Sequence, residues 1–311
     1  MRCRLKALRR LFLLAACFAI PAWSSGAGDS LPTHFPDAPR IVAIGDLHGD
    51  LAATRRALKL AGAIDDEDHW IGGTLVLVQT GDQMDRGDGE QAILDLLVRL
   101  AEEAARAGGA VHVLNGNHEL LNPALDFRYA TAGGFKDFED ATAIAGADSL
   151  LLTFDETQRA RVAAFRPGGS YARVLAQRNT VVVIGPNVFV HGGILPEYVY
   201  YGIERLNIEV RAWLAGEGPY PATIRSRRSP VWCRLYSSDV TDAACDTLTE
   251  ALEELCAKRM IVGHTVQEKG ITSFCGGKVW CIDVGMSAAY GSGTPQVLEI
   301  KGDTVRVLRE K

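Results

Sequence analysis

The 311-residue sequence lacks the excess of positive charge that nucleic-acid binding requires. Its formal net charge is −5, so a nucleic acid would meet no concentrated basic surface, and we expect no such partner. The sequence also lacks internal repeats, low-complexity tracts and an apolar run long enough to span a bilayer comfortably. With 47% hydrophobic and 23% charged residues, what remains is an ordinary globular composition.

No two cysteines stand at C-x-x-C spacing, so we predict no thiolate metal site. Of the 7 cysteines, Cys3 and Cys17 fall in the N-terminal segment, and the other five are Cys233, Cys245, Cys256, Cys275 and Cys281. In an oxidising compartment this odd number predicts one or two disulfides with a thiol left over, and the pairing stays open. None of the cysteines has the context of a catalytic nucleophile.

The first 27 residues have the order of a secretory signal peptide. Basic residues open the chain, an apolar run from Leu11 to Ala22 follows, and small residues come next at Ser24 to Ala27. We therefore predict a signal peptide over residues 1–27, a periplasmic or secreted protein, and no stable membrane insertion after its removal. Two alternatives stay open: a short membrane anchor, and a lipoprotein attached at Cys17, which Leu14-Ala15-Ala16 precedes as in a lipoprotein box.

Strands and helices alternate in the hydrophobic pattern of the first half. Strands are expected at 40–44, 74–80 and 110–114, and helices at 51–60 and 90–107. Strand, motif and helix recur in this order, which predicts parallel βαβ units and an α/β fold. Later strands are expected at 180–184, 188–190, 260–262, 271–275, 278–282, 296–300 and 304–308, and later helices at 197–214 and 246–257. Residues 120–178 are helical or irregular, which predicts a cap insertion.

Five polar residues lie one to three positions beyond the ends of predicted strands: Asp46, Asp82, Asn117, His191 and His264. Ligands of α/β sheets bind at the carboxyl ends of strands. Five separate segments therefore direct a polar side chain toward one edge of the fold, which predicts a site there.

Each of these residues belongs to a short motif. The motifs are G-D-L-H-G at 45–49, G-D-Q-M-D-R-G at 81–87, G-N-H-E at 116–119, H-G-G at 191–193 and G-H-T at 263–265. Any one of them also fits a simple turn, but the set does not. With these motifs the chain resembles the calcineurin-like metallophosphoesterases from Ile41 to Ser287. The resemblance implies a sandwich of mixed β-sheets flanked by helices over residues 40–311, with a helical cap insertion at 120–178.

Within that superfamily the sequence resembles the phosphoprotein phosphatases, because Asp85-Arg86-Gly87 and Asn117-His118-Glu119 follow their pattern. It departs from the eukaryotic core members: Asn115 replaces their arginine, G-H-T replaces their R-x-H-Q-like segment, and their S-A-P-N-Y loop is missing. The segments S-P-V-W-C-R at 229–234 and D-V-G-M-S at 283–287 instead resemble the Shewanella-like branch found in bacteria and plants.

The resemblance assigns metal ligands to six positions: Asp46, His48, Asp82, Asn117, His191 and His264. Asp46 and His48 would hold one ion, Asp82 would bridge, and the remaining three would hold the other, with His264 as an alternative ligand of the first. Oxygen and imidazole ligands without thiolate suit two divalent ions, with Mn²⁺ as first choice and Fe, Zn or Mg as alternatives. The resemblance also implies direct attack of a metal-bridging hydroxide on phosphorus.

Five further residues complete the implied catalytic site. His118 is the expected general acid, and Asp85 would orient it. Arg86 would stabilise phosphate oxygens, with Arg234 as a second clamp, because a guanidinium binds phosphate through paired hydrogen bonds. Tyr290 is expected to line the pocket.

The activity that the Shewanella-like resemblance implies is hydrolysis of phosphate monoesters of serine, threonine or tyrosine in a protein or peptide. Two alternatives stay open. One is a hydrolase of dinucleoside polyphosphates or other small phosphate esters on the same core. The other is an inactive metal-dependent binding module, against which the intact His118 and Asp85 argue.

Overall fold

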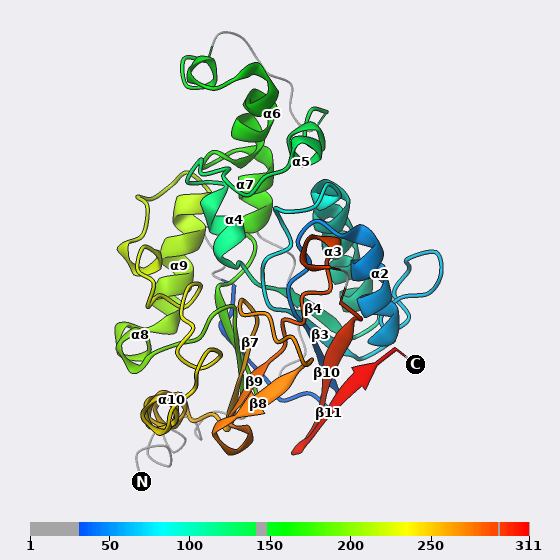
Figure 1. Cartoon of the computed structure of the whole chain (residues 1–311), viewed down its shortest axis with the longest axis vertical. Helices are drawn as coiled ribbons and strands as arrows, with labels where there is room; N and C mark the ends of the chain where they lie inside the picture. Colours follow the sequence, from blue (N-terminus) through cyan, green and yellow to red (C-terminus); the bar gives the residue numbers. More distant parts are fainter. Residues whose placement is uncertain (1–30, 141–147, 292, 311) are drawn as a thin grey trace, which may run out of the picture. The chain divides into compact units, whose positions relative to one another are not determined.

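The computed structural model describes residues 31–140, 148–291 and 293–310, and the predicted signal peptide lies outside them. Within the described part, two β-sheets carry helices on their outer sides (Figure 1). This confirms the α/β sandwich of mixed sheets flanked by helices.

The larger sheet contains six strands in the order β1-β5-β6-β7-β9-β8. They span His34–Phe35, Val181–Ile184, Asn187–Val190, Arg259–Val262, Val279–Cys281 and Thr272–Phe274. β6, β7 and β9 run parallel, while the hairpins β5–β6 and β8–β9 are antiparallel. The sequence pattern did not predict β1, which has only two residues and pairs with β5.

The smaller sheet contains five strands in the order β11-β10-β2-β3-β4. They span Thr304–Arg309, Gln296–Lys301, Ile41–Ile44, Val76–Gln79 and Ala110–Val113. β2, β3 and β4 are parallel, as the βαβ pattern predicts, and β10 and β11 add antiparallel to them. Of the last four strands, β8 and β9 thus belong to the larger sheet, and β10 and β11 belong to the smaller one.

The main core lies between the sheets. Both faces of β5 are buried. Val182 and Ile184 pack into the core shared with β2 and β3, whereas Val181 and Val183 pack into a second core beneath the helices on the other side of the sheet. Alternate residues of a strand point to opposite faces, so both faces of β5 must be apolar.

The predicted helices flank the sheets. α2 (Leu51–Leu60) and α3 (Glu90–Arg106) have the bounds expected from their periodicity to within a residue, and Asp50 caps α2 by accepting a hydrogen bond from the Ala53 N–H. The predicted helix at 197–214 is wrong as a single element. It divides into α8 (Pro196–Tyr201) and α9 (Ile203–Leu214) because Gly202 has φ +104°, a conformation open to glycine but not to a helix interior.

The segment that begins at the G-N-H-E motif and ends before β5 contains helices joined by turns in its described part. Its helices are α4 (Asn117–Leu121), α5 (Ala132–Lys136), α6 (Glu156–Phe165) and α7 (Ser170–Leu175). They gather at the top of Figure 1, beyond the upper strand ends. Phe138, Phe165 and Tyr171 form an aromatic cluster there, with the Phe138 ring 4.8 Å from Phe165 and 5.0 Å from Tyr171. This cluster is part of a core that the insertion shares with α3, through Leu94, and with α9, through Leu206.

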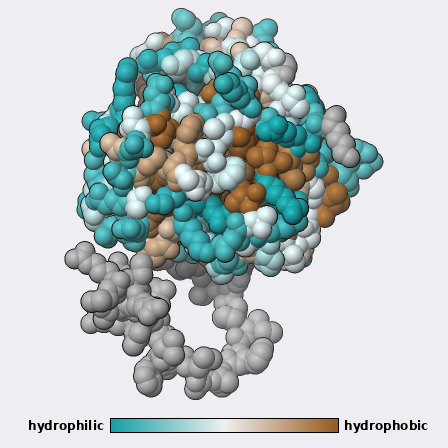
Figure 2. Space-filling model, turned by 60° about the horizontal axis from the view of Figure 1, so that its bottom comes forward, coloured by the Kyte–Doolittle hydropathy of each residue, from teal (hydrophilic) through white to brown (hydrophobic). Residues whose placement is uncertain are grey.

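Among the described cysteines, Cys245 on α10 (Asp242–Glu254) forms a disulfide with Cys275 in the β8–β9 turn. Cys233 and Cys281 are buried free thiols. No helix of the described ranges is long and apolar enough to cross a membrane. Figure 2, which turns the bottom of Figure 1 forward, shows patches of hydrophobic residues among hydrophilic ones on that face.

Candidate metal and phosphate site

The loops that follow the parallel strands of both sheets meet in one place. Asp46 follows β2, Asp82 follows β3, Asn117 follows β4, His191 follows β6 and His264 follows β7. All five side chains are buried. The predicted ligands thus come together at the junction of the two sheets, with three from one sheet and two from the other.

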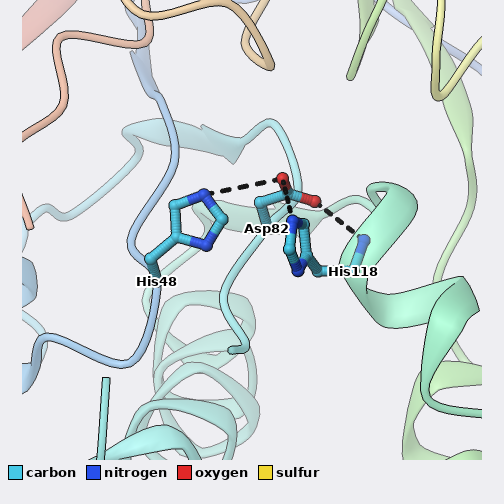
Figure 3. Close-up of side chains that lie close together, drawn as sticks. All are labelled: His48, Asp82 and His118. Carbon is cyan, nitrogen blue, oxygen red and sulfur yellow. Dashed lines mark hydrogen bonds and ion pairs between the residues drawn. The ribbon is translucent and has the colours of Figure 1, made fainter. Parts of the chain in front are cut away.

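His48 faces the two aspartates of the smaller sheet. Its Nε2 lies 3.7 Å from Asp82 Oδ2 and 3.9 Å from Asp46 Oδ2, and its Nδ1 lies 3.0 Å from the Met84 carbonyl (Figure 3). Since a carbonyl only accepts, Nδ1 carries the proton and the Nε2 lone pair is directed at the carboxylates. Metal-binding histidines are fixed in this way by a hydrogen bond from the other ring nitrogen.

His191 repeats this arrangement from the larger sheet. Its Nδ1 donates to the Thr80 carbonyl at 3.0 Å, which leaves a lone pair on Nε2. Nε2 then lies 2.9 Å from Asn117 Oδ1, 3.2 Å from Asp82 Oδ2 and 3.1 Å from His264 Nδ1. Asp82 is therefore common to both groups.

The chemistry of this donor set fits divalent cations. Carboxylate, amide and imidazole atoms converge without a thiolate, and the buried Nε2 of His264 makes no hydrogen bond within the described part of the chain. Burial raises the pKa of Asp46 well above its usual range, and the charges of Asp283 and Asp82 raise it further. Burial also lowers the pKa of His264 well below 6.5, with the neighbouring His191 adding to this. Cations placed among these groups would stabilise the Asp46 carboxylate, and the low pKa of His264 keeps its imidazole neutral, the form that binds a metal.

His118 lies beside His48, with the two ring centres 4.8 Å apart, and it faces Asp82 as well (Figure 3). Its hydrogen bond differs in kind from that of His48. Its Nδ1 donates to the carboxylate of Asp85 at 2.6 Å, and its Nε2 lies 3.8 Å from Asp82 Oδ2. Burial opposes the imidazolium form, yet the charge of Asp82 and the hydrogen bond to Asp85 raise the pKa of His118 above 6.5. His118 is thus suited to hold a proton, whereas His48, with a pKa lowered to about 4 mainly by burial, is suited to hold a metal.

Arg86 lies between two tyrosine rings at the opening of the site. Its guanidinium carbon is 4.8 Å from the Tyr129 ring centre and 5.2 Å from that of Tyr290. Its Nε is buried without a hydrogen-bond partner among the described residues. The Tyr290 hydroxyl is 3.3 Å from His48 Nε2, so Tyr290 lies where the sequence predicts. Tyr129, which belongs to no motif, was not predicted.

Arg234 is exposed and lies beside the site. Its Nη1 donates to the His264 carbonyl and to Thr265 Oγ1, both at 2.9 Å. It therefore holds the loop that carries His264, while its role as a second phosphate clamp stays a prediction.

The sequence motif includes Glu119, to which no role was assigned. Its buried carboxylate accepts four backbone N–H groups, from Asp82 at 2.7 Å, Gln83 at 2.8 Å, Met84 at 3.2 Å and Gly116 at 2.8 Å. The first three belong to one ligand loop and the last to another. Glu119 thus joins both loops. The G-N-H-E spacing could have indicated this role, because a glutamate three residues after a helix N-cap commonly accepts hydrogen bonds from backbone N–H groups.

Comparison with known proteins agrees with this geometry. Residues 39–268 match the model of the calcineurin-like phosphoesterase family. The chain is 42% identical to Shewanella-like protein phosphatase 2 of Arabidopsis thaliana, over 93% of this chain and 82% of that protein. It is 29% identical to Shewanella-like protein phosphatase 1 of Plasmodium berghei, over 87% and 74% of the two chains.

Solved structures share the fold. The cold-active protein-tyrosine phosphatase of a psychrophilic Shewanella superposes with a TM-score of 0.70 at 24% identity, covering 89% of this chain and 82% of that one. The chain therefore belongs to the calcineurin-like phosphoesterase family and is a metal-dependent phosphoesterase. Within the family, its similarity is to the Shewanella-like protein phosphatases.

We predict that Glu119→Gln destabilises the protein by about 2 kcal/mol or more, because the new amide N–H₂ would face backbone donors in place of an acceptor. Urea unfolding followed by tryptophan fluorescence measures this, and Glu139→Gln, at an exposed position of the insertion, is the matched control. An unchanged free energy of unfolding in Glu119→Gln would mean that this carboxylate does not hold the two loops together.

Proposed function

We propose that this protein hydrolyses phosphate monoesters of serine, threonine or tyrosine side chains with water as the nucleophile and with two divalent ions bound. The observation that carries this proposal is Arg86, whose buried Nε has no hydrogen-bond partner in the described chain. Arg86 contacts Tyr290, and the Tyr290 hydroxyl is 3.3 Å from the ligand His48. An unpaired guanidinium beside a cation site is suited to a phosphoryl group.

In this proposal Asp46, His48 and Asp82 hold one ion, and Asp82 with Asn117, His191 and His264 holds the other. When bound, the ions would activate water and neutralise charge on the phosphoryl oxygens. The remaining tasks belong to protein side chains. Arg86 would bind phosphoryl oxygens and is kept in place by Tyr129 and Tyr290 on its two sides.

His118 is proposed as the proton donor to the leaving oxygen. Its Nδ1–H bonds to Asp85, which leaves the Nε2–H facing the centre of the site. The raised pKa of His118 keeps that proton available near neutral pH, and Asp85 stabilises the imidazolium before transfer. Since water is the nucleophile, no covalent enzyme intermediate forms.

The space beside Arg86 fits a protein substrate. A cleft of about 610 Å³ is lined by Gly49, Asp50, Arg86, Asp88 and Thr131 among others, so loops of both the sandwich and the insertion border it. Relatives named protein phosphatases support the same substrate class. We also propose a periplasmic or secreted location, which is supported by the basic and apolar start of the sequence.

Free phosphate release from matched peptides tests the proposed substrate class. The purified protein with Mn²⁺ is given one peptide sequence phosphorylated on serine, threonine or tyrosine, and a dinucleoside polyphosphate in parallel. We expect phosphate from at least one phosphopeptide and little turnover of the dinucleotide. Hydrolysis of the dinucleotide alone would contradict the proposal.

We predict that Asp82→Asn lowers metal stoichiometry from two ions per chain to one or none, because both ligand groups lose their shared carboxylate. Elemental analysis after Mn²⁺ loading and gel filtration gives the count. Asp66→Asn removes an exposed carboxylate and should leave it unchanged. Retention of two ions by Asp82→Asn would contradict a shared ligand.

His118→Asn is expected to lower kcat for phenyl phosphate by about 10²- to 10⁴-fold, the usual contribution of a general acid. Metal content should stay at the wild-type level. Dinitrophenyl phosphate should lose much less activity, because its leaving group needs no proton. Loss of metal from this variant would instead identify His118 as a ligand.

A further inference from the structure

A buried arginine of the insertion contacts the partner of the general acid. Arg161 lies on α6 and has 0% of its surface exposed. Its Nη2 donates to Asp85 Oδ1 at 2.9 Å, while the other oxygen of that carboxylate accepts the His118 Nδ1–H at 2.6 Å. A cation on α6 is thus linked to the proton donor through one carboxylate.

Every N–H of the Arg161 guanidinium has an acceptor. Nε donates to Asn122 Oδ1 at 2.8 Å, Nη1 to Glu90 Oε1 at 3.2 Å and to the Gly134 carbonyl at 2.8 Å, and Nη2 to Glu90 Oε2 at 2.7 Å as well as to Asp85. Since an arginine has five N–H groups, the side chain has one orientation that satisfies them all.

Asn122 closes this arrangement into a network. Its Nδ2 is 3.2 and 3.3 Å from the two Asp85 oxygens and 3.0 Å from the His118 carbonyl. The Asp85 carboxylate is therefore held in its plane by Arg161, Asn122 and His118 together. Asp85 itself has φ +63°, in the left-handed region, so the loop alone would not favour this position.

The Arg161 guanidinium lies in an apolar environment and is balanced by the carboxylates of the network. Four phenylalanine rings lie 5.3–5.9 Å from its guanidinium carbon, so water does not solvate it. A buried charge of this kind requires charged partners, which Asp85 and Glu90 supply. An ion pair that served only to balance the charge of Arg161 would need Glu90 alone. Arg161 also bonds to the Asp85 carboxylate, which contacts His118.

We propose that Arg161 is a positioning residue of the catalytic reaction, which fixes the Asp85 carboxylate so that His118 presents its Nε2–H to the leaving group. The insertion then completes the proton donor as well as bordering the substrate cleft. This inference rests on the proposed function, because it assigns Arg161 to the general acid of that reaction. No covalent step involves Arg161.

The test compares two esters that differ in their need for a proton. Wild type, Arg161→Gln, Arg161→Lys and His118→Asn are assayed with phenyl phosphate and with dinitrophenyl phosphate, and metal content is measured for each. Arg159→Gln is the matched control, since Arg159 is on the same helix but, among the described residues, bonds to the Leu151 and Phe154 carbonyls and not to the Asp85 network.

We expect Arg161→Gln to lower the phenyl-to-dinitrophenyl ratio of kcat about tenfold or more, in the direction of His118→Asn and with metal retained. Arg161→Lys, which keeps the charge, should show a smaller shift of that ratio, and Arg159→Gln none. An equal loss on both esters, or no loss, would overturn the proposal. If Arg161→Gln does not fold, Arg161→Lys serves as the test. A phenyl-to-dinitrophenyl ratio in Arg161→Lys equal to that of wild type would then overturn the proposal.

A spectroscopic readout separates positioning from general stability. The short His118 Nδ1–H···Asp85 bond should give a strongly downfield imidazole proton resonance in metal-free protein, which His118→Asn identifies by its loss. Arg161→Lys should move or broaden this signal, and Arg159→Gln should not. If wild type hydrolyses neither ester, the proposed function fails. If wild type and His118→Asn behave as expected while the Arg161 variants keep the wild-type ratio and resonance, only this inference fails.

Discussion

Buried carboxylates of like charge impose the main constraint on this molecule. Asp46, Asp82 and Asp283 lie close enough that the latter two raise the pKa of Asp46, and Glu119 adds to the effect. Such a group is stable in a protein interior only where donors or cations surround it. Backbone N–H groups, imidazoles and the expected ions supply them, and this requirement determines which residues the strand-end loops carry.

The sandwich meets this constraint by bringing loops from two sheets together. β2, β3 and β4 supply aspartates and an asparagine, whereas β6 and β7 supply histidines. Several site residues adopt positive φ, among them His48, Asp82 and His264. Such conformations cost energy at residues other than glycine, and the hydrogen bonds of the loops offset that cost.

The site could be predicted from sequence to the extent that its residues belong to local motifs. Asp82 and His118 could be predicted as site residues because each follows a strand in a short recognisable pattern. Arg161 could not be found in this way, because it follows Asp85 by 76 positions and sits in a helix with no motif. The break at Gly202 was missed for a different reason: the apolar spacing continues across it, and only the backbone conformation shows the interruption. The two-sheet arrangement came from the family resemblance, because alternating strands and helices describe a single parallel sheet equally well.

Glu119 bears on the order in which the protein is assembled. Its carboxylate joins the Asp82 loop to the Gly116 loop through hydrogen bonds that need no ion, so the ligand loops can take their shape as the chain folds. Zinc fingers behave differently, because they stay unfolded until the metal arrives. Here loading can follow folding as a separate event. The folded chain would then offer the same donor atoms to whichever divalent ion it meets.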